Sequence, residues 1–329
     1  MNNADEELML TVSMTVYNHE EYIEHAIQSV LMQKVNFKYE FLIGEDCSTD
    51  RSYEICKKFA DDNPDKIHLL HREKNIGAKK NLEDLWLRSQ GKYLIHLEGD
   101  DYWTDENKLQ KQMDFLESHP DYIACAHKFH VVDRYENVYY DRDFEIQFLQ
   151  DNPYSIQDFE HGLMLSHANS LLFRNFIRDK SIDWDFWLNR PSYAHFTGDT
   201  TLTMILVSHG KLYCLEEYMS CYRKVTDSDS SSHSAMQEYN NTRDLKFRGE
   251  RYLEEIFGDR IDFSQRKKNI FASAVFKWYR DRNRKNFTVV QEIIRVSGHR
   301  IQYSLSFVYL VSARWILNVT GRKNQRVSF

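Results

Sequence analysis

The chain has 329 residues, of which 42% are hydrophobic and 14% aromatic, and only four are prolines. This composition argues against a disordered protein and is typical of one large folded domain with an appendage, or of two domains. The five cysteines are odd in number and form no CxxC pair. The sequence therefore indicates neither a disulfide framework nor a zinc ribbon, and it fits a reducing compartment.

The net charge of −7 is divided unevenly along the chain. Residues 260–329 hold 15 Lys and Arg against 3 Asp and Glu, so the acidic excess lies upstream of them. We expect the basic part to face an anionic surface or polymer, but not nucleic acid, because the rest of the chain is strongly acidic. The acidic N-terminus, "MNNADEELML", shows no signal peptide, so we expect a cytoplasmic protein.

The first half of the chain alternates expected strands with expected helices. Apolar and β-branched runs of strand length predict the strands, and apolar residues at helical spacing predict the helices between them. The predicted strands are 10–16, 39–46, 66–70 and 92–97, and the intervening helices contain 23–31, 55–59 and 82–86.

Polar residues follow three of these strands at the points where the strands end. They are Tyr17 and Asn18, then Glu45 and Asp46, then the segment 98–101. Strands that alternate with helices imply right-handed crossovers and a mostly parallel sheet, in which ligands bind beyond the carboxyl ends of the strands. We therefore expect these side chains to line one crevice.

The second half of the chain is less regular. Its tail reads as helical and basic, after a polar stretch in which we place a boundary between two domains, 1–225 and 226–329. The expected elements before that boundary are a helix at 109–116, a strand at 122–133, an irregular region at 134–165, a helix at 199–209 and a strand with a loop at 211–223.

The segment "EGDDYW" places three carboxylates, Glu98, Asp100 and Asp101, directly after a predicted buried strand. Oxygen ligands of this kind suit Mg²⁺ or Mn²⁺, which proteins commonly bind through one or two carboxylates together with phosphate oxygens. Such a site would neutralise a diphosphate. The alternative is a solvated turn followed by a helix cap, and the motif alone does not decide between the two.

Four segments resemble, in order, the family 2 glycosyltransferases of GT-A fold, over residues 11 to about 223. This resemblance implies a Rossmann-like, mostly parallel sheet flanked by helices, here with a C-terminal helical appendage. The four segments are "VSMTVYNHEEYIEHAIQSVLMQ", "YEFLIGEDCSTD", "NIGAKKNLEDLWLRSQGKYLIHLEGDDYW" and "TGDTTLTMILVSHGKLYCLEEYMSCYR".

The resemblance also implies roles for individual residues. The matching positions bind the nucleotide, whose base is usually uracil, and a divalent cation, Mn²⁺ or Mg²⁺. Glu98 replaces an aspartate that is common in the family, which leaves open which carboxylate holds the metal. The residues are Thr15, Tyr17, Asp46, Glu98 and Asp100 for the nucleotide, and Asp100 and Asp101 for the metal.

Two further roles follow from the last segment. Asp199 matches the catalytic base of inverting members, although Gly-Asp-Thr-Thr before an apolar helix is also a good N-cap. Arg223 is a candidate contact for the diphosphate, with a surface ion pair as its alternative. Outside that segment, Asn169 and Ser170 match the acceptor side of the cleft, although Ser and Asn before a strand are equally ordinary turn residues. Trp103 could stack on a sugar or pack in the core.

The resemblance thus implies a metal-dependent, inverting hexosyltransferase that moves a sugar from a nucleotide, typically UDP, to an acceptor hydroxyl of a glycan or lipid-linked glycan during cell-surface polysaccharide synthesis. One alternative is a catalytically silent relative that binds a sugar nucleotide or acts as a scaffold. A methyltransferase is disfavoured, because "VYNHEEY" lacks the glycines expected after the first strand of such enzymes.

Residues 301–317, "IQYSLSFVYLVSARWIL", are too short and too interrupted by polar residues to predict a transmembrane helix. Basic flanks and the aromatic residues Tyr303, Tyr309 and Trp315 are typical of a helix lying on an anionic membrane surface. That placement would put the protein at the inner face of the cell membrane. The alternative is a helix packed on the catalytic domain or on a second copy of the chain.

Overall fold

The computed structural model describes residues 7–138, 153–181, 198–224 and 243–319. The chain divides into two compact units, which we call the sheet unit (1–155, 164–189 and 202–233) and the helical unit (156–163, 190–201 and 234–329). The domain boundary predicted at residue 225 lies outside the described residues and stays a prediction. We describe each unit by itself.

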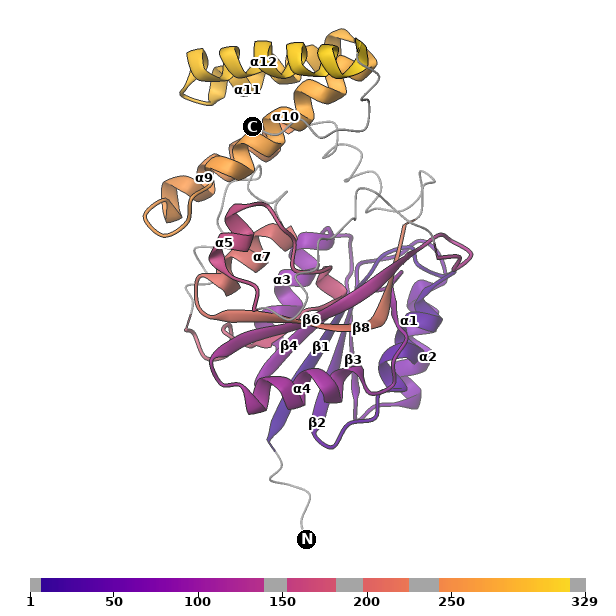
Figure 1. Ribbon diagram of the computed structural model, residues 1–329. Helices are drawn as coiled ribbons and strands as arrows, with labels where there is room; N and C mark the ends of the chain where they lie inside the picture. The colour runs from indigo at the N-terminus through magenta and orange to yellow at the C-terminus, as the bar shows by residue number, and fades with distance from the viewer. Residues whose placement is uncertain (1–6, 139–152, 182–197, 225–242, 320–329) are drawn as a thin grey trace. The chain divides into compact units, whose positions relative to one another are not determined.

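The sheet unit contains one eight-stranded sheet with the strand order β3-β2-β1-β4-β7-β6-β8-β5 (Figure 1). The pairs of β1 with β2 and β4, of β2 with β3 and of β6 with β8 are parallel, and the pairs that involve β7 or β5 are antiparallel. The strands are β1 (Leu8–Val16), β2 (Lys38–Glu45), β3 (Ile67–His71), β4 (Tyr93–Glu98), β5 (Tyr102–Trp103), β6 (Tyr122–Val132), β7 (Leu172–Arg174) and β8 (Lys211–Arg223).

The four strands predicted in the first half of the chain are confirmed to within two residues at each end. The short strands β5 and β7 were not predicted, because two or three residues show no periodicity. Residues 211–223 form one continuous strand rather than the predicted strand and loop. Because β7 lies antiparallel between β4 and β6, the sheet is a mixed one with a parallel half, β3-β2-β1-β4, that carries the polar strand ends.

Helices cover both faces of the parallel half. Leu10, Val12 and Met14 of β1 point to one face, where they share a fully buried core with three helices, α1 (Ile23–Leu31), α2 (Ser52–Asp62) and α4 (Lys108–Ser118). The alternate residue Ser13 points to the other face, where its hydroxyl accepts a hydrogen bond from the indole of Trp86 on α3 (Ala78–Arg88). The period of two in β1 therefore separates an apolar face from a polar one.

A glycine at the start of β4 is required by close backbone packing. A Cβ atom at Gly91 would lie 2.3 Å from the backbone nitrogen of Thr11 and 2.5 Å from the carbonyl carbon of Leu10. Because backbone cannot move aside as a side chain can, we expect Gly91→Ala to lower the free energy of unfolding by about 3 kcal/mol. Urea unfolding measures this. Gly210→Ala is the control, since its nearest neighbour is the side chain of Ile123, and we expect a clearly smaller loss there.

The helical unit has its own core, formed by Phe247, Phe271, Val275, Val290 and Leu310 among others. A buried ion pair joins Arg266 to Glu250, which is fully buried. The helices are α5 (Ile156–Glu160), α9 (Arg243–Phe257), α10 (Ser264–Asp281), α11 (Arg284–Val296) and α12 (Arg300–Val319). The predicted C-terminal helical appendage is therefore present.

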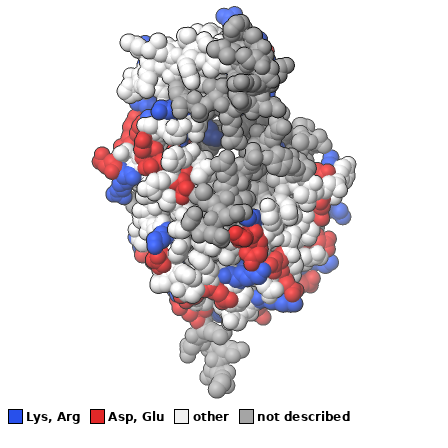
Figure 2. All heavy atoms as spheres, in the orientation of Figure 1, with Lys and Arg blue, Asp and Glu red and all other residues white. Residues whose placement is uncertain are grey.

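The last helix, α12, is apolar on two sides. Tyr303 and Leu310 are buried in the helical core, whereas four other apolar side chains of α12 are exposed. The side of the helical unit that Figure 2 shows carries few charged side chains. The exposed residues are Ile301, Leu305, Val308 and Tyr309. None of the described helices is long and apolar enough to cross a membrane. The predicted membrane contact and its alternative both stay predictions.

Candidate functional site

The polar ends of β1, β2 and β4 lie side by side. In the strand register Thr15 is opposite Glu98, and Val16 is opposite Glu45. The backbone N–H of Asp46 donates to the carbonyl oxygen of Val16 at 2.9 Å, which extends the pairing one residue beyond β2. The structure therefore brings together the strand ends that the sequence analysis placed in one crevice.

The acidic pair after β2 is buried and bound within the protein. The two carboxylate oxygens of Asp46 accept hydrogen bonds from the backbone N–H groups of Ile76 and Gly77 at 2.8 and 2.9 Å. Glu45 accepts from the backbone N–H of Ser48 at 2.7 Å and lies 2.6 Å from the Nδ1 of His71. Asp46 thus fastens the loop before α3, and its predicted contact with a nucleotide base stays a prediction.

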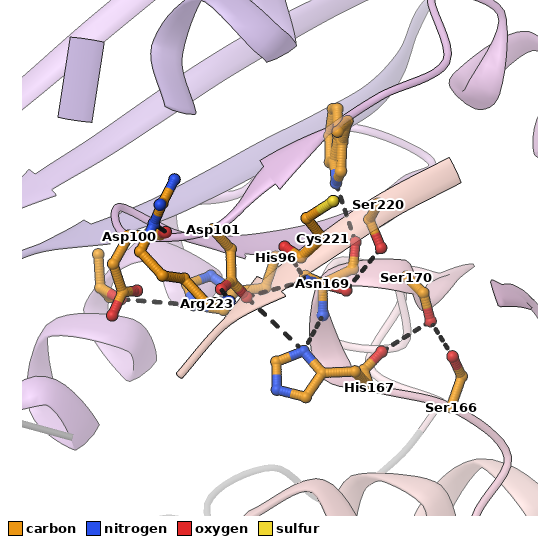
Figure 3. A network of polar contacts seen from close by, with 12 residues as sticks. His96, Asp100, Asp101, Ser166, His167, Asn169, Ser170, Ser220, Cys221 and Arg223 are labelled. Carbon is orange, nitrogen blue, oxygen red and sulfur yellow. Dashed lines mark hydrogen bonds and ion pairs between the residues drawn. The ribbon is translucent and has the colours of Figure 1, made fainter. Parts of the chain in front are cut away.

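The two neighbouring carboxylates after β4 have different environments (Figure 3). Asp101 is almost fully buried, and it accepts from the backbone N–H of Arg223 and from the side-chain amide of Asn169, both at 2.8 Å. Asp100 has no hydrogen bond to its carboxylate among the described residues. The Nε2 of His19 lies 3.9 Å from its Oδ2. Asp101 therefore accepts hydrogen bonds within the protein, whereas the carboxylate of Asp100 remains available. The predicted metal and nucleotide roles of these carboxylates stay predictions.

Arg223 is almost fully buried and is bound on all sides by protein groups. Its Nε donates to the carbonyl oxygen of Asp100 at 2.8 Å, and one terminal nitrogen donates to Glu136 at 2.8 Å. The other terminal nitrogen reaches two backbone carbonyls, and the guanidinium stacks on Tyr22. The structure gives Arg223 a positioning role for the carboxylate loop that the sequence analysis missed. Its predicted diphosphate contact stays a prediction.

The crowding of negative charge at this edge affects Asp101 itself. Burial, together with the neighbouring carboxylates of Asp100 and Glu98, raises the pKa of Asp101 well above its ordinary value. The negative electrostatic potential at this edge therefore favours a cation near the three carboxylates. Among the described residues, no group of three or more His, Cys, Asp or Glu side chains is arranged to hold a metal ion. One or two protein carboxylates can hold Mg²⁺ or Mn²⁺ when phosphate oxygens complete its coordination. The carboxylates present at this edge therefore fit such an ion.

A neutral histidine, His96, lies on β4 two residues before Glu98, and its ring faces polar residues of β1. The Nδ1 of His96 is 3.1 Å from the hydroxyl of Ser13, and its Nε2 is 3.4 Å from that of Thr15. Burial, and to a smaller extent the charge of His167, lowers the pKa of His96 to about 3. The sequence analysis missed this network, although Ser13, Thr15 and His96 are polar residues in two mostly apolar strands.

The buried His96 predicts how stability changes with pH. Its pKa is lower in the folded state than in the unfolded chain, where histidine titrates near 6.5, so the unfolded state binds more protons between these values. The folded protein should therefore lose stability as the pH falls from about 6.5 toward 3. We expect His96→Asn to reduce this slope of the unfolding free energy, measured by urea unfolding at several pH values. A variant with an unchanged slope would contradict the assignment.

Asn169 and Ser170, predicted for the acceptor side, and Trp103, predicted to stack on a sugar or pack in the core, are all buried. Asn169 lies in a short 3-10 helix, η2 (Ala168–Ser170), and is 1% exposed. Its side chain links Asp101 to Ser220 and to the carbonyl oxygen of Cys221. Trp103 is also buried, and its indole donates to the carbonyl oxygen of Asn169 at 2.9 Å, so the core alternative for this tryptophan is confirmed.

The predicted catalytic base lies at the start of a helix. Asp199 belongs to the first turn of α7 (Gly198–Val207), which agrees with the helix predicted at 199–209. Its side chain lies outside what the structure describes. The roles of Asp199 as a base and as a helix cap therefore both stay predictions.

The mixed α/β sheet, flanked by helices and followed by C-terminal helices, has the architecture of the GT-A fold. The likeness to solved structures agrees with this fold. Residues 1–349 of TarS from S. aureus superpose with a TM-score of 0.64 over 98% of this chain and 94% of that one, at 15% identity. The structure of the same region in complex with UDP-GlcNAc gives a TM-score of 0.62 over 90% of this chain and 81% of that one, at 16% identity.

The family follows from the sequence comparisons. The model of glycosyl transferase family 2 matches residues 11–179, about half of the chain, and the chain belongs to this family. It is 33% identical over 214 residues to the uncharacterized protein Rv1520 of Mycobacterium tuberculosis, which covers 63% of this chain and 56% of that one. It is 33% identical over 121 residues to the putative teichuronic acid biosynthesis glycosyltransferase TuaG of Bacillus subtilis, covering 37% and 45%. The chain thus spans about half the length of these relatives.

Proposed function

We propose that this protein is a metal-dependent, inverting glycosyltransferase that moves a sugar from a nucleotide, UDP in the first instance, to an acceptor hydroxyl in cell-surface polysaccharide synthesis. The observation that carries the proposal is the available carboxylate of Asp100, which lies at the shared edge of β1, β2 and β4 in a family 2 chain. The relative TuaG, named as a putative teichuronic acid biosynthesis glycosyltransferase, supports a polysaccharide as the product. The UDP-GlcNAc complex of TarS supports the donor class.

In the proposed reaction two carboxylates, those of Asp100 and Asp199, have different roles. Asp100 would hold a divalent cation, which when bound supplies positive charge against the departing diphosphate. Asp199 would accept the proton of the acceptor hydroxyl as that oxygen attacks the anomeric carbon from the side opposite the leaving group. Attack from the opposite side inverts the configuration of the anomeric carbon. Asp101 and Arg223 would keep the loop that carries Asp100 in place.

The proposed base gives a specific kinetic prediction. Asp199→Asn removes the proton acceptor but keeps the size of the side chain, so we expect kcat to fall by about 10²–10³-fold with little change in the KM for the donor. Steady-state transfer assays at saturating cation measure both constants. Asp179→Asn changes an aspartate outside the site and should leave kcat unchanged. Full activity of Asp199→Asn would refute the role of Asp199 as the base.

The function itself is tested by turnover. Purified protein is incubated with a panel of nucleotide sugars and Mn²⁺, with and without glycan acceptors, and the release of nucleoside diphosphate is measured. We expect release from at least one UDP-sugar, and NMR of the product should show an inverted anomeric configuration. Binding of a nucleotide sugar without any turnover would instead support the alternative of a silent relative or scaffold.

The proposal includes a location for the C-terminal region. The exposed apolar residues of α12 and the basic tail favour contact with an anionic membrane surface, where a lipid-linked acceptor would be found, or with a second copy of the chain. Flotation with vesicles of anionic and neutral lipids tests the first alternative, and analytical ultracentrifugation tests the second. Such a location would place the enzyme at the inner face of the cell membrane.

A further inference from the structure

A buried histidine lies beside the available carboxylate of Asp100. The residue is His19, in the loop that leads from β1 into α1, and its side chain is 10% exposed. Its Nε2 is directed at the Oδ2 of Asp100 over a distance of 3.9 Å, which is too long for a hydrogen bond. This residue belongs to none of the roles that the sequence analysis assigned.

The imidazole of His19 lacks the partners expected for a buried polar ring. Its Nδ1 has no hydrogen-bond partner among the described residues. A buried polar atom without a partner costs about 1–3 kcal/mol. This nitrogen faces Gly99, whereas the other ring nitrogen, Nε2, faces the carboxylate of Asp100. His96 has both ring nitrogens near hydroxyl groups instead, whereas the core residue His127, like His19, has a ring nitrogen without a hydrogen-bond partner in the described part of the chain. His19 differs from His127 in facing the carboxylate of Asp100.

The position of His19 is fixed by its surroundings. Its backbone N–H donates to the hydroxyl of Ser52 at 2.8 Å, and its carbonyl oxygen accepts from the N–H groups that begin α1. The ring packs against Gly99, where a Cβ atom would lie 2.7 Å from Nδ1. The glycine between Glu98 and Asp100 therefore makes room for this ring, and the ring is held against the carboxylate loop.

We propose that His19 is the second protein ligand, after Asp100, of the divalent cation. Two ligand atoms at about 2.1 Å from one ion lie roughly 3.0 Å apart when adjacent and about 4.2 Å apart when opposite. The observed 3.9 Å between Nε2 and Oδ2 lies between these two values, so a small movement of either side chain would bring both atoms within reach of one ion. One nitrogen and one carboxylate make a set smaller than three residues, and diphosphate oxygens complete it. The inference rests on the proposed function, because the cation is the one expected to accompany the nucleotide.

An imidazole ligand changes the choice of metal. Carboxylates and phosphates suit Mg²⁺ and Mn²⁺ alike, whereas a nitrogen ligand favours the transition metal. We therefore expect Mn²⁺ to bind at least about tenfold more tightly than Mg²⁺ in the presence of UDP, and His19→Ala to reduce this ratio toward one. Calorimetric titration of each metal into the full chain with UDP measures it.

Pulsed electron paramagnetic resonance gives a direct test. The full chain is loaded with Mn²⁺ and UDP, and the spectrum is recorded for unlabelled protein and for protein with ¹⁵N-labelled histidine. We expect modulation from one directly bound imidazole nitrogen, which changes with the isotope. This comparison uses the native chain and does not depend on how a variant folds.

Variants then assign the nitrogen. His19→Ala should lose the modulation, whereas His71→Ala, at the same edge of the sheet on β3, should keep it. Bound Mn²⁺ without nitrogen modulation, or modulation that survives in His19→Ala, would overturn the role of His19 and leave the proposed function in place. A failure of Mn²⁺ to bind with any nucleoside diphosphate would overturn both.

Discussion

Asp100→Asn should abolish most of the glycosyl transfer while leaving the protein folded. The variant loses the negative charge that would hold the cation, and the charge stabilisation that such a cation supplies amounts to several kcal/mol, so we expect kcat/KM to fall by about 10³-fold. Stability should be unchanged or slightly higher, because Asp100 is one of the carboxylates that disfavour ionisation of Asp101. Transfer assays and urea unfolding, on the same preparations, check both statements.

The matched control for this variant is Glu106→Gln. Glu106 lies a few residues along the chain, is 49% exposed and pairs with Lys34 at the surface. The substitution removes one negative charge close to the site without touching the strand edge, and exposed ion pairs contribute little to stability. Activity of Glu106→Gln should equal that of the native protein. Equal losses in both variants would show that the effect is one of overall charge.

Asp101→Ala should lower the free energy of unfolding, unlike the substitution of its immediate neighbour Asp100. The substitution removes the acceptor of the Arg223 backbone N–H and of the Asn169 amide, and it leaves both donors buried. We expect the free energy of unfolding to fall by about 3–5 kcal/mol. Urea unfolding measures this loss. Asp101→Asn, which keeps one carbonyl oxygen, should lose less.

The control for Asp101 is Asp121→Ala. Asp121 is 55% exposed and pairs with Lys211, so its removal should change the free energy of unfolding by no more than about 0.5 kcal/mol. If Asp101→Ala were as stable as this control, Asp101 would not be the structural acceptor that its hydrogen bonds indicate. The predicted role of Asp101 as a metal ligand would then be the better explanation of its position.

The sequence predicted the parallel half of the sheet well, for a physical reason. Strands such as 10–16 and 92–97 are buried on both faces, so their apolar and β-branched composition shows in any one sequence. The strand β7 was beyond prediction, because three residues carry no period and its pairing with β4 and β6 is a long-range contact. The continuous β8 was predicted only in part, since its middle is exposed and polar.

The sequence predicted where the site lies, but not which of its carboxylates is hydrogen-bonded within the protein. The sequence places Asp100 and Asp101 next to each other. It cannot show that Asp101 accepts hydrogen bonds from Arg223 and Asn169, which are more than 60 residues away along the chain. For the same reason the sequence did not show that the guanidinium of Arg223 binds the carbonyl oxygen of Asp100 and the carboxylate of Glu136. His19 was missed because an isolated histidine in a loop carries no signal until Gly99 brings its ring against the carboxylate loop.

The most direct test of the central claim is calorimetric binding of UDP to the full chain, with and without Mn²⁺, in the native protein and in Asp100→Asn. The claim that the carboxyl ends of β1, β2 and β4 form a cation-assisted nucleotide site predicts that Mn²⁺ strengthens UDP binding by at least about tenfold in the native protein and has no effect in Asp100→Asn. UDP binding that is equally tight without Mn²⁺, or that keeps its full metal dependence in Asp100→Asn, would contradict it.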